Sequence, residues 1–260
     1  MIEEPYRWME AISNRREYIE HQLSGGSPIA AMTYRDGILL FTVSRERQKI
    51  FEVYDRIAMG AIGHPGDMER LRMAAIELAS TEGFARSADD VSLRRLATYS
   101  LSPILKAAFE QIYGPPYLAR LLFAELGRGS GPNLFVRLDY DGSLHSNGGS
   151  FGRVFEDFGY LASTPASGAL MERFLRERVK TETSLEEALG VAADAWAVGH
   201  LALEDADRQE LPSAAQIAAH REQQFADLAL ETAVMERTSP SRITYRSIPE
   251  EEIRRLLAAR

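Results

Sequence analysis

The sequence contains no cysteine among its 260 residues. Disulfide bonds, thiolate metal sites and a cysteine nucleophile are therefore excluded. The chain also lacks a long apolar run, whereas a membrane-spanning helix needs about 20 consecutive apolar residues. Its first residues, MIEEPYRW, are acidic and polar, unlike the basic start and apolar core of a signal peptide. These absences predict that the protein has no membrane partner and is cytoplasmic.

Positive charge is outnumbered by negative charge. Lys and Arg number 30 against 38 Asp and Glu, a formal net charge of −8, and the pI is near 5.3. Nucleic acids are bound by concentrated basic surfaces, so we expect no nucleic-acid partner. What the chain does have is 45% hydrophobic and 26% charged residues, the composition of a globular protein with a sizeable core.

The first periodic segment predicts an amphipathic helix over residues 5–24. Its apolar positions recur at helical spacing: Trp8, Ile12, Ile19 and Leu23. Residues 29–34 and 38–43 then flank a turn, Arg35-Asp36-Gly37, which predicts a β-hairpin. The second of these strands is apolar without alternation, which is typical of a strand covered on both faces.

Strands and helices follow in blocks. Further strands are expected over residues 49–54, 57–62, 118–126, 134–140, 154–161, 225–235 and 242–246. Helices are expected after Pro65 and after Asp89, with a break at Pro103, and over residues 166–178, 185–203 and 249–259. The polar stretch 204–224 interrupts the periodicity and is interpreted as an exposed insertion. Blocks of this kind favour an α+β fold, with helices outside and two sheets inside, in four layers.

Ser27 raises the question of catalysis. In an N-terminal-nucleophile hydrolase, cleavage before a Ser, Thr or Cys frees an α-amine that acts as the base, and Gly26-Ser27 resembles such a cleavage point. However, Pro28 follows, the second strand has Val43 where a supporting acid would be needed, and the nearest lysine is Lys49 on the third strand. Ser27 is interpreted as a loop residue, with a nucleophile as the alternative.

Two other kinds of side chain are candidates for a functional site. Lys49 begins a strand and is either an edge lysine that discourages aggregation or a fixed cation that captures a carboxylate. The five histidines are far apart in sequence and in no spacing typical of a metal site, so they are interpreted as surface or structural residues: His21, His64, His145, His200 and His220. No metal or other cofactor is expected.

Residues 48–97 resemble the α-type subunits of the bacterial 20S proteasome, as found in actinobacteria. The similarity lies in QKIFEVYDR (48–56), in the small residues of 58–63, and in Gly-Phe-Ala at 83–85. Asp-Val at 90–91, the YDGS turn at 140–143 and the segment MERTSPSRITYRSI at 235–248 extend it.

The resemblance implies a fold and a role. The family has a four-layer α-β-β-α sandwich of the N-terminal-nucleophile hydrolase type, here a single domain, 1–260, with its core in 27–203 and 225–247. Its α-type subunits keep their N-terminus uncleaved and form seven-membered rings that cap rings of β-type subunits. The implied chain is a homo-heptamer without catalytic residues. Threonine-type endopeptidase activity against unfolded proteins belongs to the β partner.

The resemblance also implies two functional regions. Met1, Ile2, Glu3, Glu4 and Pro5 would converge at the ring axis and act as a gate. Lys49 matches the family's lysine that pairs with the C-terminal carboxylate of a ring-shaped ATPase activator, a charge-assisted contact. The alternative function is a self-compartmentalising peptidase that uses Ser27 after residues 1–26 are removed.

Overall fold

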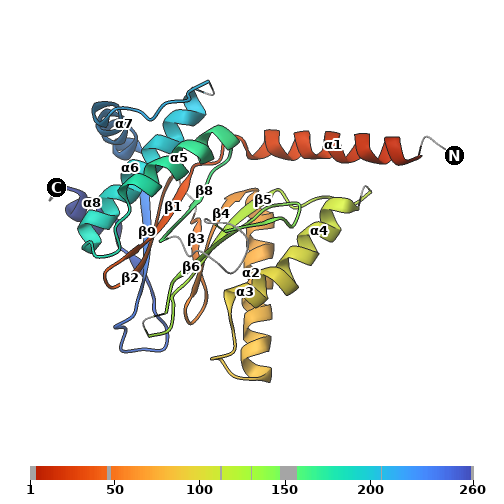
Figure 1. Ribbon diagram of the computed structural model, residues 1–260, viewed down its shortest axis with the longest axis horizontal. Coiled ribbons are helices and arrows are strands. Elements are labelled where there is room, and N and C mark those ends of the chain that lie inside the picture. Colours follow the sequence, from red (N-terminus) through yellow and green to blue (C-terminus); the bar gives the residue numbers. More distant parts are fainter. Residues whose placement is uncertain are drawn as a thin grey trace.

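Two antiparallel sheets stack in the middle of the molecule, and helices cover the outer face of each (Figure 1). The computed structural model describes residues 4–45, 48–111, 113–129, 131–146, 157–205 and 207–258. The first sheet has the strand order β10-β9-β2-β1-β8. Its strands are β1 (Ile29–Tyr34), β2 (Gly37–Ser44), β8 (Phe158–Leu161), β9 (Ala229–Glu236) and β10 (Tyr245–Ile248). The second has the order β3-β4-β5-β6-β7. Its strands are β3 (Ile50–Tyr54), β4 (Ile57–Gly63), β5 (Ala119–Glu125), β6 (Leu134–Leu138) and β7 (Leu144–His145).

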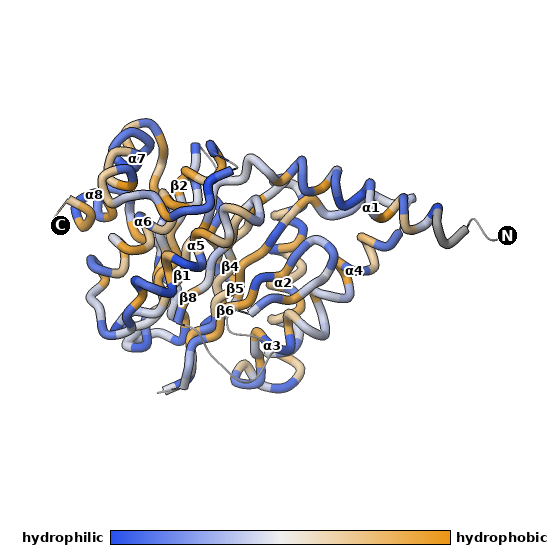
Figure 2. Tube along the Cα trace, turned by 45° about the horizontal axis from the view of Figure 1, so that its top comes forward, coloured by the Kyte–Doolittle hydropathy of each residue, from blue (hydrophilic) through white to orange (hydrophobic). Residues whose placement is uncertain are grey.

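Both faces of the central strands are buried, which explains their unbroken hydrophobic sequences. In β2, Ile38 and Leu40 point between the sheets, whereas Leu39, Phe41 and Val43 point toward the helices that cover this sheet. Successive side chains of a strand face opposite sides, so a strand enclosed by two apolar layers needs apolar residues at every position. Figure 2 shows this concentration of hydrophobic residues in the middle of the fold.

One helical layer covers the first sheet. It consists of α5 (Pro165–Arg178), α6 (Leu185–Glu204), α7 (Ala214–Asp227) and α8 (Glu250–Ala258). Helix α6 packs on β1 and β2, and its side chains, Trp196 among them, fill the apolar cluster beneath. Ser184 caps α6 in a capping box with Glu187, which satisfies two backbone amides at the start of the helix.

The other helical layer covers the second sheet. It consists of α2 (Pro65–Ala85), α3 (Leu93–Arg95), the π-helical segment η1 (Leu96–Leu101) and α4 (Ser102–Glu110). The predicted break at Pro103 coincides with η1, where the amide of Ser102 bonds to the carbonyl of Ala97. Pro103 then lies in the first turn of α4, where its missing N–H costs least.

Helix α1 (Glu4–Leu23) extends away from the body of the molecule, with the N-terminus at its far end (Figure 1). Its C-terminal half, from Ile12 onward, packs against the rest. There Ile19 and Leu23 form a small apolar cluster with Phe109 of α4 and Tyr140.

The four-layer α-β-β-α sandwich predicted from the sequence is confirmed. The interpretation of residues 204–224 as an exposed insertion was wrong in one respect, because most of α7 lies there and buries Ile217 and His220. Phe225 was assigned to a strand but belongs to α7. The short strand β7 was not predicted, because two residues carry no periodicity.

Two remaining expectations concern the strand before α5 and membrane insertion. Of the strand expected over 154–161, the structure describes β8, whereas residues 154–156 lie outside the described part. No helix within the described ranges combines the length and the apolar character needed to cross a membrane.

Candidate functional site

A cavity of about 650 Å³ lies beside the ends of β1, β2 and α6. It brings together the two residues that the sequence had singled out, Ser27 and Lys49, and adds His200 and Glu204 from α6. The walls also include Val43 of β2. Residues far apart in the sequence therefore share one polar site.

Lys49 is held at both ends. Its backbone amide donates a hydrogen bond to Oε2 of Glu231 at 2.9 Å, and the amide of Ile50 donates to Oε1 at 2.9 Å. At the other end, Nζ donates to the carbonyl oxygen of Ser27 at 2.9 Å. The carboxylate of Glu231, on β9, thus fixes the backbone from which the lysine side chain enters the cavity.

Burial sets the charge behaviour of this pair. Desolvation lowers the pKa of Lys49 to about 8, although the negative charge of Glu231 acts in the opposite direction. Burial also raises the pKa of Glu231, against the effect of the two backbone amides and of Lys49. Near pH 7, Lys49 is therefore a mostly protonated, poorly solvated cation, which suits it to binding a carboxylate.

The hydroxyl of Ser27 makes two hydrogen bonds. Oγ donates to the carbonyl oxygen of Val43 at 2.6 Å and accepts from Nε1 of Trp196 at 2.9 Å. Val43, which stands where a supporting acid would be needed, therefore supplies a backbone carbonyl, which is no base for the hydroxyl proton. Nζ of Lys49 contacts the carbonyl of Ser27. Trp196 was not predicted to belong to the site, because a tryptophan in an apolar helix is normally a core residue.

Two of the residues predicted as a gate stand at the outer end of α1. Glu4 and Pro5 begin this helix, whereas Met1, Ile2 and Glu3 lie outside the described residues. The inner end of α1 is anchored by Arg120 of β5. Its Nη2 donates to Glu20 at 2.6 Å, its Nε to Asp139 at 3.0 Å, and its Nη1 to the carbonyl of Ser163 at 2.7 Å.

Two of the five histidines come together in the fold, against the expectation from their spacing. His200 and His220 lie beside Glu204, whereas His21, His64 and His145 lie on α1, before α2 and on β7. One signal was present in the sequence: His200 and Glu204 are four residues apart and thus share a helix face. The third residue, His220, lies in the polar stretch 204–224, which the sequence predicts to be an exposed insertion.

Comparison with known proteins defines the class. Residues 23–206 match the model of a family described as proteasome subunit. The chain belongs to this family. Its fold and the leading helix before β1 agree with this assignment.

Within the family, the similar proteins are named proteasome subunit alpha. One from Nocardioides sp. is 32% identical over 198 residues, 75% of this chain and 72% of the relative. One from Kineococcus radiotolerans is 30% identical over 251 residues, 96% of this chain and 94% of the relative. One from Thermobifida fusca is 29% identical over 250 residues, 95% of this chain and 87% of the relative. The resemblance to actinobacterial α-type subunits is confirmed.

Proposed function

We propose that this chain is a non-catalytic α-type subunit of a proteasome core particle in the cytoplasm. Seven copies form an outer ring on a ring of β-type subunits, which carry the peptidase activity. Residues 1–5 of each copy form a gate that restricts the entry of unfolded proteins into the ring. Lys49 binds a ring-shaped ATPase activator.

The observation that carries the proposal is the leading helix. Ile19 and Leu23 are buried against Phe109 and Tyr140, and Glu20 pairs with Arg120 at 2.6 Å. The end of α1 that precedes Ser27 is therefore an integral part of the folded body, which supports a retained N-terminus. Similarity to the proteasome subunit alpha of Kineococcus radiotolerans spans 96% of the chain, which supports the same role.

Exposed apolar side chains support assembly into a ring. The large ones among the described residues lie on α1, on α2–α4 and just beyond α4, except for Ile243: Trp8, Met9, Tyr18, Met73, Phe84, Tyr99, Ile104 and Tyr113. Single exposed apolar residues are ordinary, but their concentration on one side is typical of an interaction surface. We assign this side to contacts with neighbouring and β-type subunits.

The cavity around Lys49 supports docking of an activator. A cation whose pKa is lowered to about 8 by burial gains when a carboxylate enters, because the pair then replaces lost solvation. Lys49 is already positioned by Glu231 through the backbone, so its ammonium group is presented without a large ordering cost. The C-terminal carboxylate of an activator has the required charge and size.

Reconstitution tests the proposal. The chain is purified alone and together with an actinobacterial β-type subunit, and both samples are viewed by electron microscopy. We expect seven-membered rings of this chain at the ends of the particle. A chain that never associates with β rings would contradict the proposal.

One observation favours a second function, a peptidase that uses Ser27. Nζ of Lys49 lies 2.9 Å from the carbonyl oxygen of Ser27, so a lysine, which such an enzyme needs, is next to this residue. The two functions are separated by particles in which the β nucleophile has been replaced by alanine. The α-type role predicts no peptidase activity, whereas activity that disappears in Ser27→Ala would establish the peptidase.

A further inference from the structure

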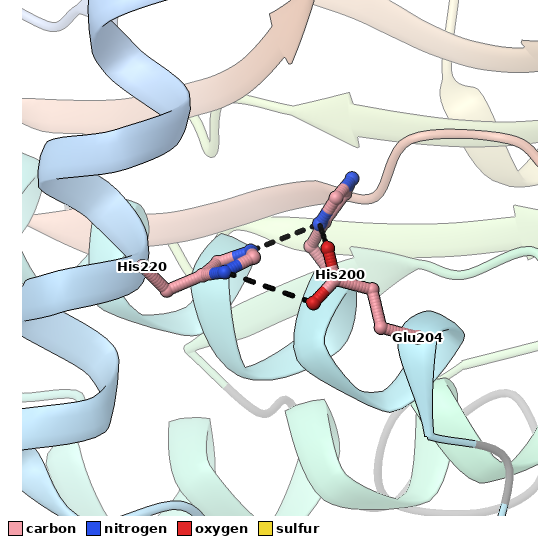
Figure 3. Close-up of side chains that lie close together, drawn as sticks. All are labelled: His200, Glu204 and His220. Atoms are coloured by element: carbon pink, nitrogen blue, oxygen red, sulfur yellow. Dashed lines mark hydrogen bonds and ion pairs between the residues drawn. The ribbon is translucent and has the colours of Figure 1, made fainter.

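His200, Glu204 and His220 form a compact polar cluster between α6 and α7 (Figure 3). Nδ1 of His200 lies 2.9 Å from Nε2 of His220. Oε1 of Glu204 is 3.7 Å from Nδ1 of His200, and Oε2 is 3.9 Å from Nδ1 of His220. One potential ligand atom from each residue lies within 4.8 Å of the others.

The surrounding structure holds both imidazoles in place. The ring of Trp196 stacks on His200 with centroids 4.8 Å apart and on His220 with centroids 6.0 Å apart. His220 is buried, with 6% of its surface exposed, and His200 shares a face of α6 with Glu204. Two rings fixed in this way need little rearrangement to bind a common partner.

We propose that His200, Glu204 and His220 bind a divalent transition metal of the Zn²⁺ type, which ties α7 to α6. Two imidazole nitrogens and one carboxylate are a ligand set that Zn²⁺ takes in proteins, with a water molecule completing the tetrahedron. At Zn–N distances of about 2.0–2.1 Å, the two nitrogens lie about 3.3 Å apart in a tetrahedral site. The 2.9 Å between Nδ1 of His200 and Nε2 of His220 then has to lengthen by only a few tenths of an ångström.

The charges around the cluster bear on the choice of ligand. Burial lowers the pKa of both His200 and His220, which favours the neutral imidazoles that metals require. Glu204 supplies negative charge, and its side chain is 50% exposed, so it is able to rotate toward an ion. Lys49 is a nearby positive charge, which opposes the binding of a cation. The same charge also lowers the pKa of His200. The site therefore suits one divalent ion held by a carboxylate.

Metal binding to the tag-free, full-length chain tests this proposal. After dialysis against Zn²⁺ and removal of unbound ion, elemental analysis should find one zinc per chain. Titration with Co²⁺ should produce the visible absorption of a tetrahedral complex, and Zn²⁺ should raise the Tm. His220→Gln and Glu204→Gln should each weaken binding at least roughly tenfold, whereas the matched control His64→Gln, at an exposed position, should bind like the wild type.

The proposal has a clear opposite result. If the three polar groups only hydrogen-bond to one another, the variants will lower the Tm without changing the zinc content. A wild-type chain that retains no zinc, or a Glu204→Gln chain that retains as much as the wild type, overturns the metal site. Glu204→Gln is informative even if His220→Gln fails to fold, because residue 204 is half exposed.

Discussion

The two helical layers of this protein cover similar sheets but present different surfaces to solvent. On the side of α1–α4, large apolar side chains are exposed, including Phe84 at 96% and Tyr99 at 77%. Within the described residues of α5–α8, no large apolar side chain is exposed to a comparable degree. That layer instead has its polar groups near Lys49, including His200 and Glu204.

This contrast separates two kinds of contact. Apolar exposure favours permanent association with other subunits, because burial of that surface is the main driving force for assembly. A cavity with a desolvated cation favours a reversible, charge-dependent partner. We therefore assign assembly to the first side of the molecule and activator docking to the cavity at the second.

The largest effect is expected from a charge on the apolar side. Phe84→Glu should weaken assembly with β-type subunits about 100-fold or more, because an unpaired charge buried in an interface costs about 3 kcal/mol. Light scattering coupled to size-exclusion chromatography measures the assembled fraction. Ala219→Glu, at an exposed position on α7, is the matched control and should assemble normally. An equal loss of assembly in both variants would contradict the proposed difference between the two layers.

Lys49→Ala should abolish activator-stimulated protein degradation. The carboxylate of the activator would lose its cation, whereas assembly and β activity on short peptides should remain. Lys180→Ala, at an exposed position after α5, is the control and should retain full stimulation. Unchanged stimulation in Lys49→Ala would contradict the docking role of the cavity.

Deletion of residues 1–5 should raise the basal hydrolysis of long peptides by assembled particles several-fold. The reason is that this proposed gate would no longer narrow the entrance of the ring. Hydrolysis of dipeptide- or tripeptide-sized substrates serves as the control and should change little. Equal rates on long peptides before and after deletion would argue against a gate in this segment.

The pH dependence of stimulation sharpens the assignment of Lys49. Its pKa of about 8 lies below the ordinary value of 10.5, so the charge that binds the activator is present below pH 8 and is lost above it. At pH 9, stimulation should fall to about a tenth. Lys49→Arg stays charged and should show no such fall; a parallel decline in both would implicate another group.

The same pKa shift has a consequence for stability. Between about pH 8 and 10.5 the unfolded chain binds more protons at Lys49 than the folded chain does. The contribution of this residue to the free energy of unfolding therefore rises with pH across that window. Below this pH window Lys49 is charged in the folded chain as well, so the cost of burying its charge is fully present there.

The smallest effect concerns the anchor of α1. Glu20→Gln should lower the free energy of unfolding by about 1–2 kcal/mol, because the buried guanidinium of Arg120 would lose a charged partner but keep Asp139. Urea denaturation measures the loss. Glu17→Gln, on the exposed face of the same helix, should change it by less than about 0.5 kcal/mol.

The layers of the fold were predictable because their signals are local and repeated. Ile38–Phe41 is apolar at every position since both faces of β2 are covered, and Ser184 marks the start of α6 by its capping box. Helix α7 was harder to predict. Its buried face rests on Ile217, His220 and Phe225, too few apolar positions to stand out in a polar stretch.

The candidate site was only partly predictable for a different reason. Lys49 and Ser27 were each identified, but their contact depends on how β3 approaches the start of β1 across the two sheets. The partner of Ser27, Trp196, the partner of Lys49, Glu231, and the partner of His200, His220, come from three later elements. No spacing rule connects them, because only the tertiary fold places them together.

The mass of the mature chain, purified from assembled particles, tests the central claim most directly. A retained N-terminus predicts the full chain of 29.0 kDa, with α1 still preceding Ser27. A chain that has lost residues 1–26 and begins at Ser27 would contradict the account, because it would carry a free α-amine beside a hydroxyl nucleophile.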